Sequence, residues 1–92
     1  MNAKEIKALT GARTRTQGET ILYNQLAARQ WFYGGRKAEC AGYDRRKDRV
    51  HFTVTWAAEA GAVGHRRVGL PLNTALNTTD GLIDPDLAEI LY

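Results

Sequence analysis

Residues 49–56 read Arg-Val-His-Phe-Thr-Val-Thr-Trp and decide the fold of this 92-residue chain. Apolar side chains at positions 50, 52, 54 and 56 alternate with polar ones throughout the stretch. Successive side chains of a β-strand point to opposite faces, so this period of two predicts a strand with one buried face and one exposed face. Phe52 and Trp56 share the apolar side and are predicted core residues.

Residues 36–43 are the predicted hairpin partner of this strand, joined to it through the turn 44–48. If Tyr43 stands opposite Arg49, the pairing places small residues across from large ones on the buried side. The predicted pairs are Gly42 with Val50, Cys40 with Phe52, and Ala38 with Val54.

A third strand is predicted at 66–72, reached through the small-residue loop 57–64. It would bury Val68, Leu70 and Leu72, and Pro71 suits the edge of a sheet because proline cannot donate to a ladder.

Helices are predicted on both sides of the strands. The N-terminal part reads as a short helix at 3–9, a mobile connection at 11–18 and a main helix at 19–31 that ends at Gly34 and Gly35. After Asn73 the chain reads as irregular until Asp84-Pro85, a helix start whose helix would turn Leu87, Ile90 and Leu91 inward.

These elements predict an α+β domain in the order α-α-β-β-β-α. Its core would be a three-stranded antiparallel β-meander with helices packed on one face. Residues 1–92 would form a single small globular domain, with 1–18 as a partly flexible N-terminal segment.

Composition narrows the class of protein. The chain is 43% apolar and 25% charged, which is typical of globular domains. Its one cysteine, Cys40, cannot form an intrachain disulfide, and the chain begins without the apolar region of a secretion signal, so we expect a cytoplasmic protein. No apolar run approaches the roughly 20 residues that cross a membrane, so no membrane association is expected.

Charge is the strongest functional clue. All thirteen Lys and Arg residues lie between Lys4 and Arg67, whereas residues 68–92 hold four acids and no base. In the predicted register, basic residues gather on the exposed sheet face and at the turn 44–48 with one aromatic residue. This predicts a surface that binds nucleic acid or an acidic partner, made of Lys37, Tyr43, Arg45, Arg46, Lys47, Arg49 and Arg67. The acidic end of the chain could also fold back and neutralise that surface.

Catalytic and metal sites are not predicted. The predicted register places Cys40 on the buried face and His51 on the opposite one, so they cannot converge on a metal ion or act as nucleophile and base. We therefore expect no enzyme activity, no catalytic residue, no metal and no cofactor.

The run from Lys4 to Arg15 resembles the first helix and turn of a helix-turn-helix. The next helix of that motif would need apolar residues where Gln17 and Thr20 stand, and Gly18 would interrupt it. The chain is not assigned to that family.

Two functional hypotheses remain. The first is a small non-enzymatic module whose basic sheet face and hairpin tip bind nucleic acid, with Tyr43 or an exposed Trp31 stacking on a base. The second is a protein-binding inhibitor or adaptor, for example a phage-encoded anti-defence protein, that occupies an acidic or nucleic-acid-binding groove of a larger protein. The opposite charges of the two parts also permit a homodimer.

Overall fold

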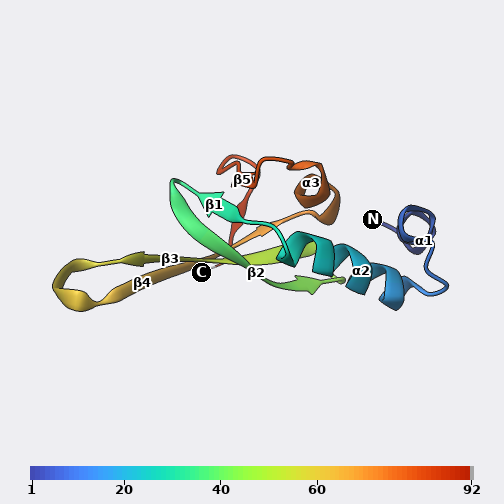
Figure 1. The fold of residues 1–92 in the computed structure, drawn as a ribbon, viewed down its shortest axis with the longest axis horizontal. Coiled ribbons are helices and arrows are strands. Elements are labelled where there is room, and N and C mark those ends of the chain that lie inside the picture. The colour runs from blue at the N-terminus through green and yellow to red at the C-terminus, as the bar shows by residue number, and fades with distance from the viewer. Residues whose placement is uncertain (92) are drawn as a thin grey trace.

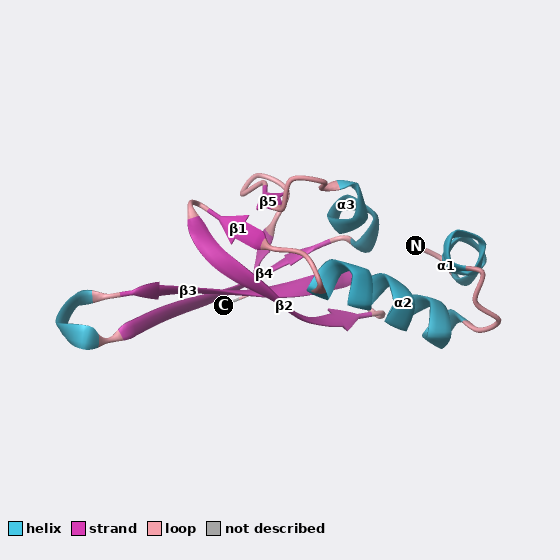
Figure 2. Ribbon diagram, viewed as in Figure 1, coloured by secondary structure: helices cyan, strands magenta, loops and turns pink. Residues whose placement is uncertain are grey.

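The computed structural model describes residues 1–91 and confirms the α+β class (Figures 1 and 2). The sheet is larger than predicted: six strands in the order β5-β1-β2-β3-β4-β6 form one curled, mixed sheet instead of a three-stranded meander. The elements are α1 (Ala3–Thr10), α2 (Arg15–Ala27), β1 (Trp31–Tyr33), β2 (Arg36–Asp44), β3 (Arg49–Ala57), the 3-10 turn η1 (Glu59–Gly61), β4 (Val63–Leu70), α3 (Leu72–Asn77), β5 (Leu82–Ile83) and β6 (Glu89–Ile90).

Helix α1 forms where it was predicted, but α2 begins earlier than expected. The hydroxyl of Thr14 accepts a hydrogen bond from the backbone N–H of Gln17 and caps α2, so residues 15–18 are helical and not a mobile connection. Gly18 permits close packing of the two helices. A β-carbon there would lie 2.4 Å from Cγ2 of Ile6, a buried core residue. The cost of glycine in a helix is therefore offset by close contact with α1.

Helix α2 ends at Ala27, and the predicted extension to residue 31 is wrong. Trp31 is the first residue of β1, and its indole N–H donates to the carbonyl of Leu26 at 2.8 Å. Gly34 and Gly35 adopt φ values of 57° and 77° and form the turn from β1 into β2. Such left-handed conformations favour glycine, so the pair marks a hairpin turn instead of a helix stop.

Strands β2 and β3 pair in the predicted register at one end, and their pairing is shifted by one residue at the other end. Ala38 lies opposite Val54 and Cys40 lies opposite Phe52, but a bulge at Ala41 then places Tyr43 opposite Val50. An extra residue in one strand exchanges the faces of all side chains beyond it. Tyr43 therefore lies on the core side of the sheet.

The predicted third strand is displaced towards the N-terminus. Val68, Leu70 and Leu72 are buried as predicted, at 2% exposure or less, but Leu72 begins α3 instead of continuing β4. Pro71 precedes the first residue of α3, where a missing backbone N–H costs no helical hydrogen bond. The segment that was predicted to be irregular after Asn73 is thus partly helical.

The C-terminal segment closes both edges of the curled sheet. β5 pairs in parallel with β1, and β6 pairs antiparallel with β4. The predicted helix after Asp84 amounts to one turn, in which the N–H groups of Leu87 and Ala88 donate to the Asp84 carbonyl. Leu87 and Ile90 are 59% and 57% exposed instead of facing inward. Tyr92, the last residue of this apolar C-terminal end, lies outside the described residues.

The core lies between the sheet and helices α2 and α3. Phe52 is fully buried, and its ring centroid is 4.7 Å from that of Trp31. Trp56 is only half-buried and borders the core, which corrects the prediction for that residue. It stands where β3 and β4 leave the body of the domain.

The β3–β4 hairpin gives the molecule its elongated outline. The principal extents are 50 × 23 × 22 Å, and Figure 1 shows the ends of β3 and β4 projecting away from the helices. Residues 55–65, the end of this hairpin, are called the arm below.

Candidate nucleic-acid interface

The outer face of the sheet, opposite the core, carries Lys37, Arg49 and Arg67, with threonine side chains among them. Thr53 lies directly between Glu39 of β2 and Arg67 of β4, and Thr55 lies opposite His65. Lys37 precedes the buried Ala38 in β2 and therefore points to the outer side, where it is exposed. The predicted alternation thus places Lys37 and Arg67 on one face.

Phe32 belongs to the candidate interface, although it was not predicted from the sequence. It pairs directly with Lys37 across β1 and β2, so the two side chains share a face, and Phe32 is half-buried. It was assigned to a helix end. The aromatic run Trp31-Phe32-Tyr33 before two glycines was the signal for a strand and turn.

The aromatic residues predicted to stack on bases do not face outward. Trp31 is 1% exposed in the core, which corrects the prediction of an exposed ring. The Tyr43 hydroxyl donates to Asp48 at 3.0 Å, and burial raises the pKa of this tyrosine to about 12. Tyr43 therefore packs against the core and stays protonated at physiological pH.

Arg45, at the tip of the β2–β3 hairpin, is tied to helix α2. Its guanidinium donates to the Glu19 carboxylate, with the shortest N–O distance at 2.6 Å, and to the Thr16 hydroxyl at 3.1 Å. These hydrogen bonds from Arg45 lower the pKa of Glu19 below its ordinary value of 4.5. The turn therefore rests on α2, and the arm is the hairpin that protrudes.

The other three cations of the hairpin tip differ in their partners. Arg49 pairs with Glu89 of β6 at 2.9 Å, so the acidic C-terminal segment does fold beside the basic region and neutralises part of it. Arg46 and Lys47 are exposed and make no ion pair within residues 1–91, although their backbone N–H groups donate to Asp44. Arg46 and Lys47 therefore keep their charge available to a partner.

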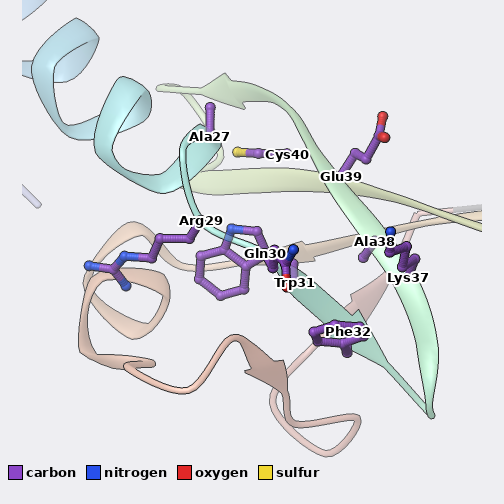
Figure 3. A pocket seen from close by; sticks show the side chains of 9 residues that line it. All are labelled: Ala27, Arg29, Gln30, Trp31, Phe32, Lys37, Ala38, Glu39 and Cys40. Carbon is purple, nitrogen blue, oxygen red and sulfur yellow. The ribbon is translucent and has the colours of Figure 1, made fainter.

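A groove of about 300 Å³ lies beside Trp31, the first residue of β1, where β2 extends beyond the residues that pair with β1 (Figure 3). Figure 3 shows its wall built from the end of α2 and from β1 and β2, with Cys40, Phe32 and Lys37 among the lining residues. Burial raises the pKa of the Cys40 thiol, which therefore stays protonated at neutral pH. His51 lies opposite Gly42 on the outer face of the sheet. Its side chain is therefore separated from that of Cys40, as the predicted register required.

Within residues 1–91, no three His, Cys, Asp or Glu side chains gather in a way that could hold a metal ion. No helix in the same range is long and apolar enough to cross a membrane. Comparison with models of protein families, with curated proteins and with solved structures found no match.

Proposed function

We propose that this chain is a non-enzymatic module that binds nucleic acid through the outer face of its sheet. The observation that supports the proposal is the placement of Lys37 and Arg67 on one face, with Thr53 and Thr55 between them and Phe32 beside Lys37. Arg46 and Lys47 extend the positive charge at the β2–β3 turn.

This combination suits a phosphate backbone more than a particular base sequence. Lysine and arginine neutralise phosphates and release counterions, while threonine hydroxyls donate hydrogen bonds to phosphate oxygens. The outer face of strands β1 to β4 holds no asparagine or glutamine, the amides that pair with adenine through two hydrogen bonds. We therefore propose binding with little sequence preference.

Phe32 favours a single strand over a duplex. A base that is free of its complement can stack on an aromatic ring, which contributes about 1 to 3 kcal/mol per base. The groove beside Phe32 and Lys37 leaves room for such a base. Phe32→Ala should therefore weaken binding of a single-stranded oligonucleotide while changing duplex binding much less.

The direct test compares two double variants that each lose two positive charges. Lys37→Ala with Arg67→Ala removes them from the outer face, and Lys4→Ala with Lys7→Ala removes them from the exposed surface of α1. Fluorescence anisotropy with a labelled oligonucleotide should show at least a tenfold loss for the first variant and less than a twofold loss for the second, since phosphate contacts are local. Equal losses would show that only net charge matters and would reject the outer face.

A protein-binding inhibitor or adaptor is the second candidate. It is favoured by the exposure of Leu82, Leu87 and Ile90 within nine residues of chain, because exposed apolar side chains of a small domain can pack against a protein partner. A pull-down from lysate with and without nuclease distinguishes the two functions. Protein partners that persist after nuclease treatment would support this candidate, whereas partners lost with the nucleic acid would support the first.

A further inference from the structure

Two arginines lie at the base of the arm on the inner face of the sheet, the face that carries the core. Arg66 lies opposite the buried Val54, and Arg36 is two residues from the buried Ala38 in β2, so both point to this face. Figure 1 shows β3 and β4 projecting away from the helices here. Both arginines are exposed, so this end of the inner face is open to a ligand.

Trp56 holds one of the two arginines in place. The Arg36 guanidinium lies 4.1 Å from the centroid of the Trp56 ring. The ring packs against Gly64 of β4, where a β-carbon would be in steric conflict with it. A guanidinium that stacks on an aromatic ring keeps the N–H groups at its edge available for two parallel hydrogen bonds to a phosphate. The stack therefore holds the Arg36 guanidinium near β4 with its donors available.

Arg66 points to the same region. It is two residues from Gly64 on the same face of β4, a distance of about 7 Å along the strand. Within residues 1–91 neither Arg36 nor Arg66 forms an ion pair with a carboxylate. Glu39, the nearest acidic residue of β2 in sequence, lies opposite Thr53 and belongs to the outer face. Two neighbouring cations without a counter-charge produce a positive potential that favours an anion.

Only the edge of β4 separates this pair from the outer face. Arg66 and Arg67 are neighbours in β4 and point to opposite faces. β6 pairs with β4 only at Val68 and Gly69, so within the described chain no strand pairs with this edge at residues 63–66. A chain of phosphates that lies on the outer face can therefore pass over the edge and reach the inner face.

We propose that Arg36 and Arg66 form a second phosphate-binding site, which takes the same nucleic-acid strand after it has crossed the edge of β4. This inference rests on the proposed function of the outer face. A single strand suits the path, because a duplex has a persistence length of about 50 nm and cannot fold over the edge of one β-strand.

The test measures binding against the length of the nucleic acid. Fluorescence anisotropy is recorded with labelled oligothymidylates of about 4 to 16 nucleotides, the site sizes of small single-strand-binding folds. Physiological salt limits the reach of each charge to about 8 Å. Arg36→Ala with Arg66→Ala should bind the longest oligonucleotide at least tenfold more weakly than wild type and the shortest one that binds less than twofold more weakly. The matched control, Lys4→Ala with Lys7→Ala on α1, should change binding less than twofold at every length.

Salt dependence provides a second readout. In wild type, the slope of log K against log salt concentration should be steeper for the longest oligonucleotide than for the shortest by about 1.4, since each phosphate of a single strand contributes about 0.7. Arg36→Ala with Arg66→Ala should remove this difference. Arg66→Ala alone should remove about half of it. Within residues 1–91 the stack on Trp56 involves Arg36 only, so the single variant leaves the ring covered and gives a result even if the double variant disturbs the arm.

Two results would overturn the proposal. A double variant that binds every length like wild type would show that Arg36 only covers Trp56 and that Arg66 contacts no phosphate. Equal losses at every length would show that the two arginines act through general charge and form no second site. Failure of the outer face is a separate result, because Lys37→Ala with Arg67→Ala would then bind the shortest oligonucleotide as tightly as wild type.

Discussion

Phe52→Ala is the sharpest test of the fold that positions the outer face. The side chain is fully buried, lies opposite Cys40 and Val68, and packs on the Trp31 ring at 4.7 Å between centroids. Truncating a buried phenylalanine costs about 3 to 5 kcal/mol, including the cavity that remains. A chain of this length is stable by roughly 5 to 14 kcal/mol, so the loss is a large part of the total.

Urea denaturation followed by far-ultraviolet circular dichroism measures the change. The midpoint should fall strongly at an unchanged slope, because the slope depends on the surface exposed on unfolding. Phe52→Leu keeps most of the volume and should cost less than about 1.5 kcal/mol, which provides a value even if the alanine variant fails to fold. Thr53→Ala, on the other face of β3, is the matched control and should change stability by well under 1 kcal/mol. Equal midpoints for Phe52→Ala and Thr53→Ala would refute the assignment of the two faces.

Three further predictions follow from individual contacts. Hydrogen bonds from Arg45 lower the pKa of Glu19 below its ordinary value of 4.5, so the ionised carboxylate stabilises the fold at any pH above 4.5. This stabilisation is lost as the pH falls through the lower pKa of the folded state. The difference in urea stability between wild type and Glu19→Gln should therefore be present at neutral pH and shrink well below pH 4.5. Gly64→Ala places a β-carbon in steric conflict with the Trp56 ring. The ring should therefore leave its position under the Arg36 guanidinium, which lies 4.1 Å from the ring centroid, and tryptophan fluorescence should shift to the red. An unchanged spectrum would contradict the packing of Trp56 on Gly64. Among the described residues the buried core ends at Ile83, so a chain that lacks residues 84–92 should remain folded with a lower melting temperature; a chain that unfolds at room temperature would contradict this account of the core.

The central strands could be predicted because their signal is local. The alternation from Val50 to Trp56 specifies which side chains share a face, and the small residues of β2 specify the register next to Phe52. The bulge at Ala41 could not be predicted in the same way. Cys40, Ala41 and Gly42 are all small, so the sequence does not show which of them is the extra residue. Its effect was to move Tyr43 to the core side.

The helix boundaries failed where tertiary contact overrides a local preference. Gly18 looks like a helix breaker, yet it is needed where Ile6 of α1 approaches α2 most closely. The segment after Asp84 has a good helix start, but it forms only one turn because residues on both sides of it pair with the edges of the sheet. Neither contact can be recognised from a sequence window.

The candidate interface was predictable only in part. Lys37 and Arg67 follow from the strand alternation, which needs no distant contact. The partners of Arg45 and Arg49 lie 26 and 40 residues away in the chain, so the sequence does not show that these cations are paired. The most useful addition from the structure is Phe32, whose pairing with Lys37 depends on the β1–β2 turn.

The salt dependence of oligonucleotide binding tests the central claim most directly. If Lys37, Arg46, Lys47 and Arg67 each neutralise one phosphate, log K should fall with log salt concentration at a slope of about −3 to −4. The Lys37→Ala, Arg67→Ala double variant should reduce the steepness of that slope by about 1.4 to 1.8, and the Lys4→Ala, Lys7→Ala control should leave it unchanged. No measurable binding at low salt, or a slope that the outer-face substitutions do not change, would contradict the assignment of this face to nucleic acid.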